Sequence, residues 1–184
     1  MRKFITLIAM IVLAAGLHAQ NEVTKFLGIP VDGTKSEMIQ KLKAKGFTYN
    51  QKEDLLEGEF NGEKVFIAVL TNNNKVWRIA VLDKRFRDET KIRIRFNNLL
   101  SQFENNSKYA SYESNAMLED DENISYGITV KKKQYEADFV QKQADGSINM
   151  NNIVWFTISY ISYNEYGIAL YYENHNNKAN GDDL

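Results

Sequence analysis

The sequence predicts an α+β fold, with an antiparallel sheet of about seven strands and two helices on one face. Three observations support this prediction. Two amphipathic segments have apolar residues at helical spacing. Short runs with alternating apolar residues are separated by tight turns such as Asn61-Gly62. The order of a helix followed by strands occurs twice, so we expect two modules in tandem, packed as one domain.

Residues 1–19 have the pattern of a secretory signal peptide. Arg2 and Lys3 precede an uncharged apolar run, and Ala19 is a small residue at the expected cleavage position. The run is shorter than the roughly 20 residues that a membrane-spanning helix needs. We therefore expect cleavage near Ala19 and a secreted or periplasmic bacterial protein without a membrane span. Since the chain contains no cysteine, we expect no lipid anchor and no disulfide.

Composition limits the classes of partner. The chain has a net charge of −1, and removal of Arg2 and Lys3 leaves −3. A dedicated nucleic-acid-binding protein would show a basic excess, so we expect no nucleic-acid partner. The length left after cleavage, about 165 residues, suits one compact domain or two small fused modules.

The first module covers residues 20–86 and begins with a well-defined helix. Thr34 and Glu37 have the spacing of a capping box, in which each side chain binds the backbone amide of the other residue. Met38 and Leu42 lie on the apolar face, and Gly46 ends the helix. Three antiparallel strands then follow within residues 55–82.

The second module covers residues 87–173. A helix is predicted over 88–103, and the polar, acidic segment 104–123 is predicted to be a surface loop. Strands are expected at 125–132 and 134–141. The closing hairpin is formed by the strand at 153–162 and the apolar run that ends at residue 173. Residues 174–184 are polar and are expected to form a flexible tail.

The capped helix and the meander after it resemble the SmpA/OmlA (BamE) type of outer-membrane assembly protein, and the doubled version resembles the beta-lactamase inhibitory protein (BLIP) fold. The residues that carry the resemblance are Gly33, Thr34, Glu37, Met38, Leu42, Gly46 and the strands from 60 to 82. They cover under half of the mature chain. The resemblance implies small secreted domains that act by binding other proteins, and it brings no catalytic residues.

Few catalytic or metal-binding groups are available. His175 is the only histidine after the signal peptide, and it lies in the predicted tail. The acidic loops that start at Asp121 and Asp145 lack the glycine and the closing glutamate of a calcium-binding EF-hand loop. We therefore expect no metal and no cofactor. The basic run from Lys131 to Lys133 is read as a hairpin end that discourages edge pairing.

The closing hairpin carries the predicted binding site. Phe156, Ile158 and Leu170 alternate with Trp155 and Tyr171. Phe156, Ile158 and Leu170 should pack under the helices. Trp155 and Tyr171 should then lie on the other face, together with Glu136 and Asp138. The candidate partner-binding residues are Trp155, Tyr171, Thr157, Ser159, Arg78 and Lys131.

Exposed tryptophan and tyrosine among polar residues are typical of protein interfaces. We therefore predict a non-enzymatic protein that binds an unknown protein partner. The alternative is a carbohydrate-binding accessory protein or a carboxylate-dependent glycan-active enzyme. The alternative to a binding role is that loop 104–123 or a second copy of the protein covers the aromatic face.

Overall fold

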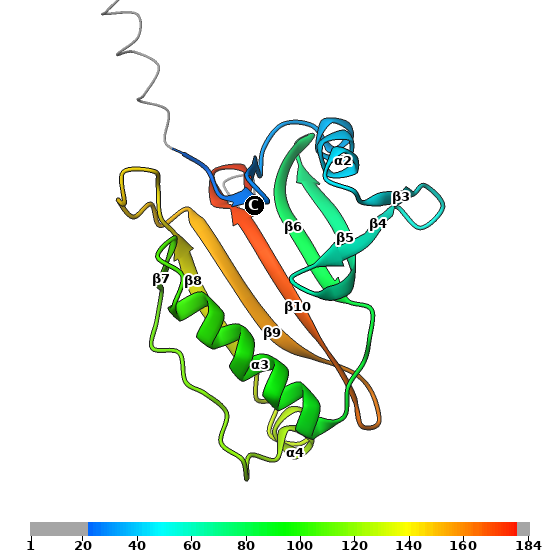
Figure 1. Ribbon diagram of the computed structural model, residues 1–184, viewed down its shortest axis with the longest axis vertical. Helices are drawn as coiled ribbons and strands as arrows, with labels where there is room; N and C mark the ends of the chain where they lie inside the picture. The colour runs from blue at the N-terminus through cyan, green and yellow to red at the C-terminus, as the bar shows by residue number, and fades with distance from the viewer. Residues whose placement is uncertain (1–21, 180–184) are drawn as a thin grey trace, which may run out of the picture.

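The computed structural model describes residues 22–179 and shows an α+β protein built on an antiparallel sheet (Figure 1). The predicted fold class is confirmed. The predicted signal peptide, residues 1–19, lies outside the described residues. The elements follow in the order β1 (Lys25–Phe26), β2 (Ile29–Pro30), α2 (Lys35–Ala44), β3 (Thr48–Asn50), β4 (Leu55–Phe60), β5 (Glu63–Asn72), β6 (Lys75–Asp83), α3 (Glu89–Glu104), β7 (Tyr109–Ser111), α4 (Ile124–Thr129), β8 (Glu136–Gln141), β9 (Asn152–Ser162), β10 (Glu165–Asn174) and the 3-10 turn η2 (His175–Asn177).

The main sheet has eight strands in the order β3-β4-β5-β6-β10-β9-β8-β7. Every neighbouring pair is antiparallel. The last strand, β10, therefore lies in the middle, between β6 and β9. The count exceeds the predicted seven because the short strands β3 and β7 extend the two edges, while one predicted strand is a helix. β1 and β2 form a separate two-stranded hairpin.

Helix α2 begins with the predicted capping box. The Thr34 amide donates to Glu37 Oε2 at 2.9 Å, and the Glu37 amide donates to Thr34 Oγ1 at 3.3 Å. Met38 and Leu42 are fully buried against the sheet. Gly46 follows the helix with φ +98°, a conformation that side chains rarely adopt. The predicted functions of these residues in the helix are therefore confirmed.

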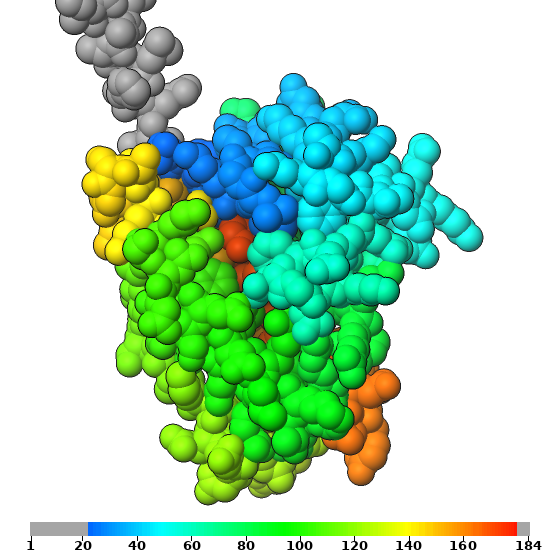
Figure 2. Space-filling model, viewed as in Figure 1, coloured from blue at the N-terminus to red at the C-terminus, as the bar shows by residue number. Residues whose placement is uncertain are grey.

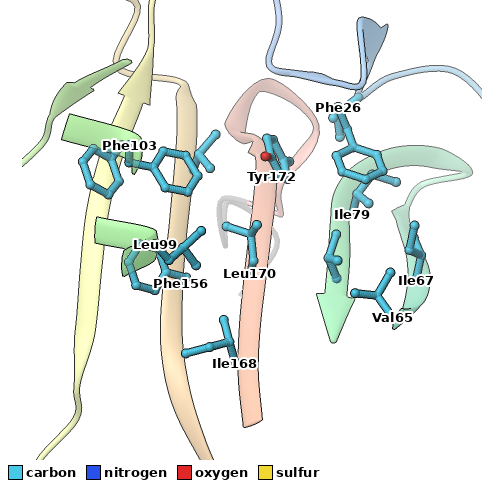
Figure 3. Close-up of a cluster of buried hydrophobic side chains, with 14 of the residues drawn as sticks. Phe26, Val65, Ile67, Ile79, Leu99, Phe103, Phe156, Ile168, Leu170 and Tyr172 are labelled. Atoms are coloured by element: carbon cyan, nitrogen blue, oxygen red, sulfur yellow. The ribbon is translucent and has the colours of Figure 1, made fainter. Parts of the chain in front are cut away.

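Helix α3 packs on the same face of the sheet as α2 (Figure 1). Phe96 meets Phe156 edge to face with ring centroids 5.0 Å apart, and Phe103 stacks on Phe139 at 4.7 Å. Figure 3 shows Leu99 and Phe103 of α3 beside Phe156 and Leu170 of the sheet. We call this helix-covered side the inner face, and it contains the hydrophobic core.

The strand predicted at 125–132 is wrong, because Ile124–Thr129 forms helix α4. The Asn123 side chain caps this helix by accepting from the Tyr126 amide at 2.8 Å. Gly127 packs so closely on Tyr135 that an added Cβ would lie 2.1 Å from the phenol oxygen. The apolar residues at 124 and 128 fit helical spacing as well as a strand, and long-range contact with Tyr135 decides between the two.

The segment 104–123 follows the edge of the sheet. After β7, the Tyr112 amide donates to the Asp138 carbonyl at 2.9 Å, and the Asn115 side chain binds the Asp138 amide at 3.0 Å. The Leu118 amide then donates to Asn97 on α3 at 2.9 Å. The segment therefore runs along β8 and joins α3 on the inner face.

The start of the predicted flexible tail is ordered in the structure. Asn174 is buried and ends β10, and its side chain donates to the Val31 carbonyl at 2.9 Å. Asn177 donates to Asp32 Oδ1 at 2.8 Å and to the Val76 carbonyl at 2.9 Å. These polar residues bind backbone and side-chain groups within residues 31–76, which composition alone does not show. Residues 180–184 lie outside the described part.

No helix among residues 22–179 is both long enough and apolar enough to span a bilayer.

Candidate functional site

The side of the main sheet opposite α2 and α3 is here called the outer face. Because side chains alternate along a strand, residues out of phase with the core lie on it. The residues on its central strands are Arg78 and Ala80 of β6, Ala169, Tyr171 and Glu173 of β10, Ile153, Trp155, Thr157 and Ser159 of β9, and Glu136 and Asp138 of β8. The structure thus places five of the six predicted binding residues on one face.

An aromatic stack lies at the centre of the outer face. Trp155 and Tyr171 are direct partners across β9 and β10. Their rings stack with centroids 4.2 Å apart and planes 26° apart. The Arg78 guanidinium lies 4.9 Å from the Tyr171 ring and 4.2 Å from the Trp77 ring. These distances are typical of cation–π contacts. The Arg78 charge and the stacked rings of Tyr171 and Trp155 therefore form one rigid surface.

Glu173 binds two members of this stack, Arg78 and Trp155, through its buried side chain. Its side chain is only 3 % exposed, and its Oε1 accepts from Trp155 Nε1 at 2.8 Å and pairs with Arg78 at 2.5 Å. Its Oε2 lies 2.6 Å from His175 Nε2. Burial alone would raise the pKa of Glu173, but the bonds from His175 and Trp155 and the charge of Arg78 lower it to about 2. The carboxylate is therefore ionised and fully engaged.

The sequence reasoning missed Glu173 and misplaced His175. Glu173 is in phase with Tyr171 on the same strand, and this spacing was the available signal for its position on the outer face. His175 was assigned to a flexible tail, although η2 holds it beside Glu173. Glu173 and His175 are partners of each other, and the other side-chain partners of Glu173 are an arginine and an indole, so among residues 22–179 no hydroxyl nucleophile completes a catalytic triad.

The other predicted site residues have different positions. Thr157 lies on the outer face, but its hydroxyl donates to the Tyr135 carbonyl at 3.0 Å. Ser159 is half-buried opposite Gly167 of β10. Lys131 is not on the outer face: it follows α4, and its ammonium lies 5.4 Å from the Tyr126 ring. The prediction that placed Lys131 on a strand of this face is wrong, because α4 forms where that strand was expected.

An acidic edge borders the aromatic stack on β8. Asp138 is the direct partner of Trp155, and Glu136 is the partner of Thr157. Among residues 22–179, neither carboxylate makes a hydrogen bond or an ion pair. Burial raises the pKa of Asp138, and the charges of Glu136, Glu113 and Glu173 raise it further. This edge therefore carries uncompensated negative charge.

A cleft on the inner face is the second candidate site. This cleft of about 1010 Å³ opens between α3, the β1–β2 turn and the β4–β5 turn, and Figure 2 shows β10 at its bottom. Leu170 and Tyr172 line the bottom, and the two carboxylates at the rim belong to Glu22 and Glu59. Bonds from Lys25 and from the Ala144 amide lower the pKa of Glu22. Glu22 is thus poorly suited to act as a general acid.

Residues 22–179 contain no cluster of three or more metal-binding side chains. The chain matches no known protein-family model, no curated protein and no solved structure.

Proposed function

We propose that this protein is a secreted or periplasmic, non-enzymatic binding protein that captures another protein through the outer face. The observation that carries the proposal is the stack of Arg78, Tyr171 and Trp155, held rigid by the buried carboxylate of Glu173. Tryptophan, tyrosine and arginine are the residue types that dominate binding energy at protein interfaces. A pre-ordered stack also loses little side-chain entropy when a partner binds.

The chemistry of the outer face favours binding over catalysis. Glu173 is ionised and has a partner on each oxygen, so it is not free to accept a substrate proton. The Thr157 hydroxyl is already bonded to the backbone and has no adjacent base. The outer face instead presents the half-buried stack of Trp155 and Tyr171, with the acidic residues of β8 beside it.

The arrangement of strands supports two modules in tandem. The first half of the chain contributes β3 to β6 and the second half contributes β7 to β10, and β6 pairs with β10 to join them. Arg78 comes from the first half, whereas Trp155 and Tyr171 come from the second. The proposed surface therefore spans the joint between the modules. The resemblance of the capped helix and its strands to SmpA/OmlA and BLIP-like domains, which bind proteins, agrees with this proposal.

A glycan ligand is the second candidate, because sugar rings stack on exposed aromatic side chains. Trp155 offers such a ring beside the hydroxyl-bearing residues Thr157 and Ser159. In this case the outer face would serve a carbohydrate-binding accessory protein or a carboxylate-dependent glycan-active enzyme. The same experiment separates the two candidates.

The test is affinity capture with the immobilised protein lacking residues 1–19, applied to exported proteins and to a panel of purified glycans. We expect a saturable protein ligand whose affinity falls at least about 30-fold in Tyr171→Ala, the loss typical of an interface anchor. Tyr163→Ala is the matched control, because this tyrosine is 89 % exposed at the tip of the β9–β10 hairpin. Unchanged capture by Tyr171→Ala, or binding of glycans alone, would contradict the proposal.

A further inference from the structure

The aromatic stack on the outer face lies directly beside the acidic edge of β8. Trp155 lies on β9, between Tyr171 on β10 and Asp138 on β8. Tyr171 covers one side of the indole, and the Arg78 guanidinium lies 4.9 Å from the Tyr171 ring and 5.8 Å from the Trp155 ring. Because neighbouring strands flank β9 on its two sides, Asp138 lies on the side of Trp155 that Tyr171 leaves free.

Two carboxylates elsewhere on the outer face are paired with a cation, and those on the acidic edge are not. Glu173 pairs with Arg78 at 2.5 Å, and Glu57 pairs with Lys84 at 2.5 Å. By contrast, Asp138, Glu136 and Glu113 form no ion pair among residues 22–179. Lys133, the nearest lysine in sequence to Glu136, pairs instead with Glu122 at 2.8 Å.

The lack of a cation is costly at Asp138 in particular. Its side chain is half-buried, so water screens the charge only in part. Burial, Glu136, Glu113 and Glu173 all raise its pKa, which means that its ionised form is less favourable than that of a carboxyl group in water. A positive charge brought here would relieve this cost, so the edge is electrostatically complementary to a basic group.

We propose that the acidic edge receives an arginine side chain of the captured protein, stacked on the free side of Trp155 and paired with Asp138 and Glu136. This inference rests on the proposed function, since it names the chemistry of the partner at that same face. The guanidinium would add a second cation to the stacked rings of Tyr171 and Trp155, on the side away from Arg78.

Arginine fits this position better than other groups. Its guanidinium is planar and stacks on an indole while its edge donates to a carboxylate in a fork. A lysine ammonium gives up more hydration and cannot do both. A neutral sugar would stack on Trp155 but would leave the charge of Asp138 and Glu136 uncompensated.

The test is a titration of the ¹⁵N-labelled protein with the peptide acetyl-Gly-Arg-Gly-amide, followed by NMR. The matched probe replaces arginine with citrulline, which has nearly the same shape and no charge. We expect the arginine peptide to shift the Trp155 indole N–H and the Asp138 amide, and the citrulline peptide to bind at least about tenfold more weakly. Asp138→Asn combined with Glu136→Gln should remove this preference, and Glu53→Gln, an exposed carboxylate in the β3–β4 turn, should preserve it.

Two outcomes would overturn the inference: equal binding of both peptides, or an arginine preference that survives in the double variant. Its failure is distinct from failure of the proposed function. A protein partner that is lost in Tyr171→Ala but bound normally by the double variant would keep the function and reject the arginine site. Capture that is insensitive to Tyr171→Ala would reject the function itself.

Discussion

The two faces of the sheet use alternate residues of the same strands, yet different forces hold them together. On the inner face, Phe156 is fully buried and packs against Phe96 and Phe103 of α3. On the outer face, the adjacent Trp155 stacks on a tyrosine and donates to the carboxylate of Glu173. The inner face is held together by apolar side chains buried under the helices. The outer face is held together by the bonds of the buried Glu173 carboxylate to its aromatic and charged neighbours.

This difference has a consequence for function. Hydrophobic contacts are non-directional, so many apolar combinations can fill the inner face. The network around Glu173 is directional, and each partner matters because a buried carboxylate without partners is costly. An outer face built in this way is held in one arrangement while its rings stay partly exposed. Trp155 is therefore both a surface residue and a structural donor, so its replacement affects stability as well as binding.

The largest effect is expected from Phe156→Ala on the inner face. Removal of a fully buried aromatic side chain should cost about 3–5 kcal/mol of unfolding free energy, through lost burial and the cavity left behind. Urea denaturation measures it. Tyr171→Ala is the comparison on the outer face, and it should cost clearly less. If both cost the same, the outer face is a second core and the contrast between the faces disappears.

A smaller but substantial loss is expected for Glu173→Gln. The amide cannot pair as strongly with Arg78 and His175, so the free energy of unfolding should fall by roughly 2–3 kcal/mol at neutral pH. Thermal and urea denaturation should agree on this loss. A variant as stable as the wild type would show that the buried charge contributes nothing to the outer face.

The same carboxylate predicts how stability depends on pH. The pKa of Glu173 is lowered from 4.5 to about 2 in the folded protein, so its contribution is complete above about pH 4.5 and is lost as the pH falls toward 2. We expect wild type to lose more stability than Glu173→Gln between pH 5 and pH 2. Parallel curves of unfolding free energy against pH would contradict this assignment.

Trp155→Phe should have a moderate effect, because phenylalanine keeps a ring to stack on Tyr171 but lacks the N–H bonded to Glu173. Loss of a hydrogen bond to a charged group costs about 1.5 kcal/mol or more, partly offset where water reaches the carboxylate. Trp77→Phe is the matched control: its indole makes no hydrogen bond among residues 22–179. Equal losses in the two variants would mean that ring size, rather than the bond to Glu173, matters.

The smallest effect is expected for Thr34→Ala, which acts on the helix covering the inner face. The variant loses the hydroxyl that accepts from the Glu37 amide, at a cost of about 1 kcal/mol. Thr34→Ser keeps the hydroxyl and should remain close to wild type in urea denaturation. A loss as large as that of Phe156→Ala would imply that the cap holds the whole inner face.

The sequence by itself determined the local elements and most of the face assignment. The cap at Thr34, the stripe of α3 and the alternation of Phe156 with Trp155 all depend on neighbours within a few residues. Such patterns are readable because helices and strands have fixed periods. The segment at 125–132 was misread because a short apolar run fits both periods, and contact of Gly127 with Tyr135 settles it.

Only the tertiary structure decided which groups meet on the outer face. Arg78 and Glu173 come from different halves of the chain, and they pair because β10 returns to lie beside β6. The pairing of β9 with β10 likewise brings the Trp155 indole to Glu173. Strand order depends on how the two halves bury their common core, and no period within one segment encodes it. The chain thus specifies its elements locally, whereas its candidate site exists only where distant strands are brought together.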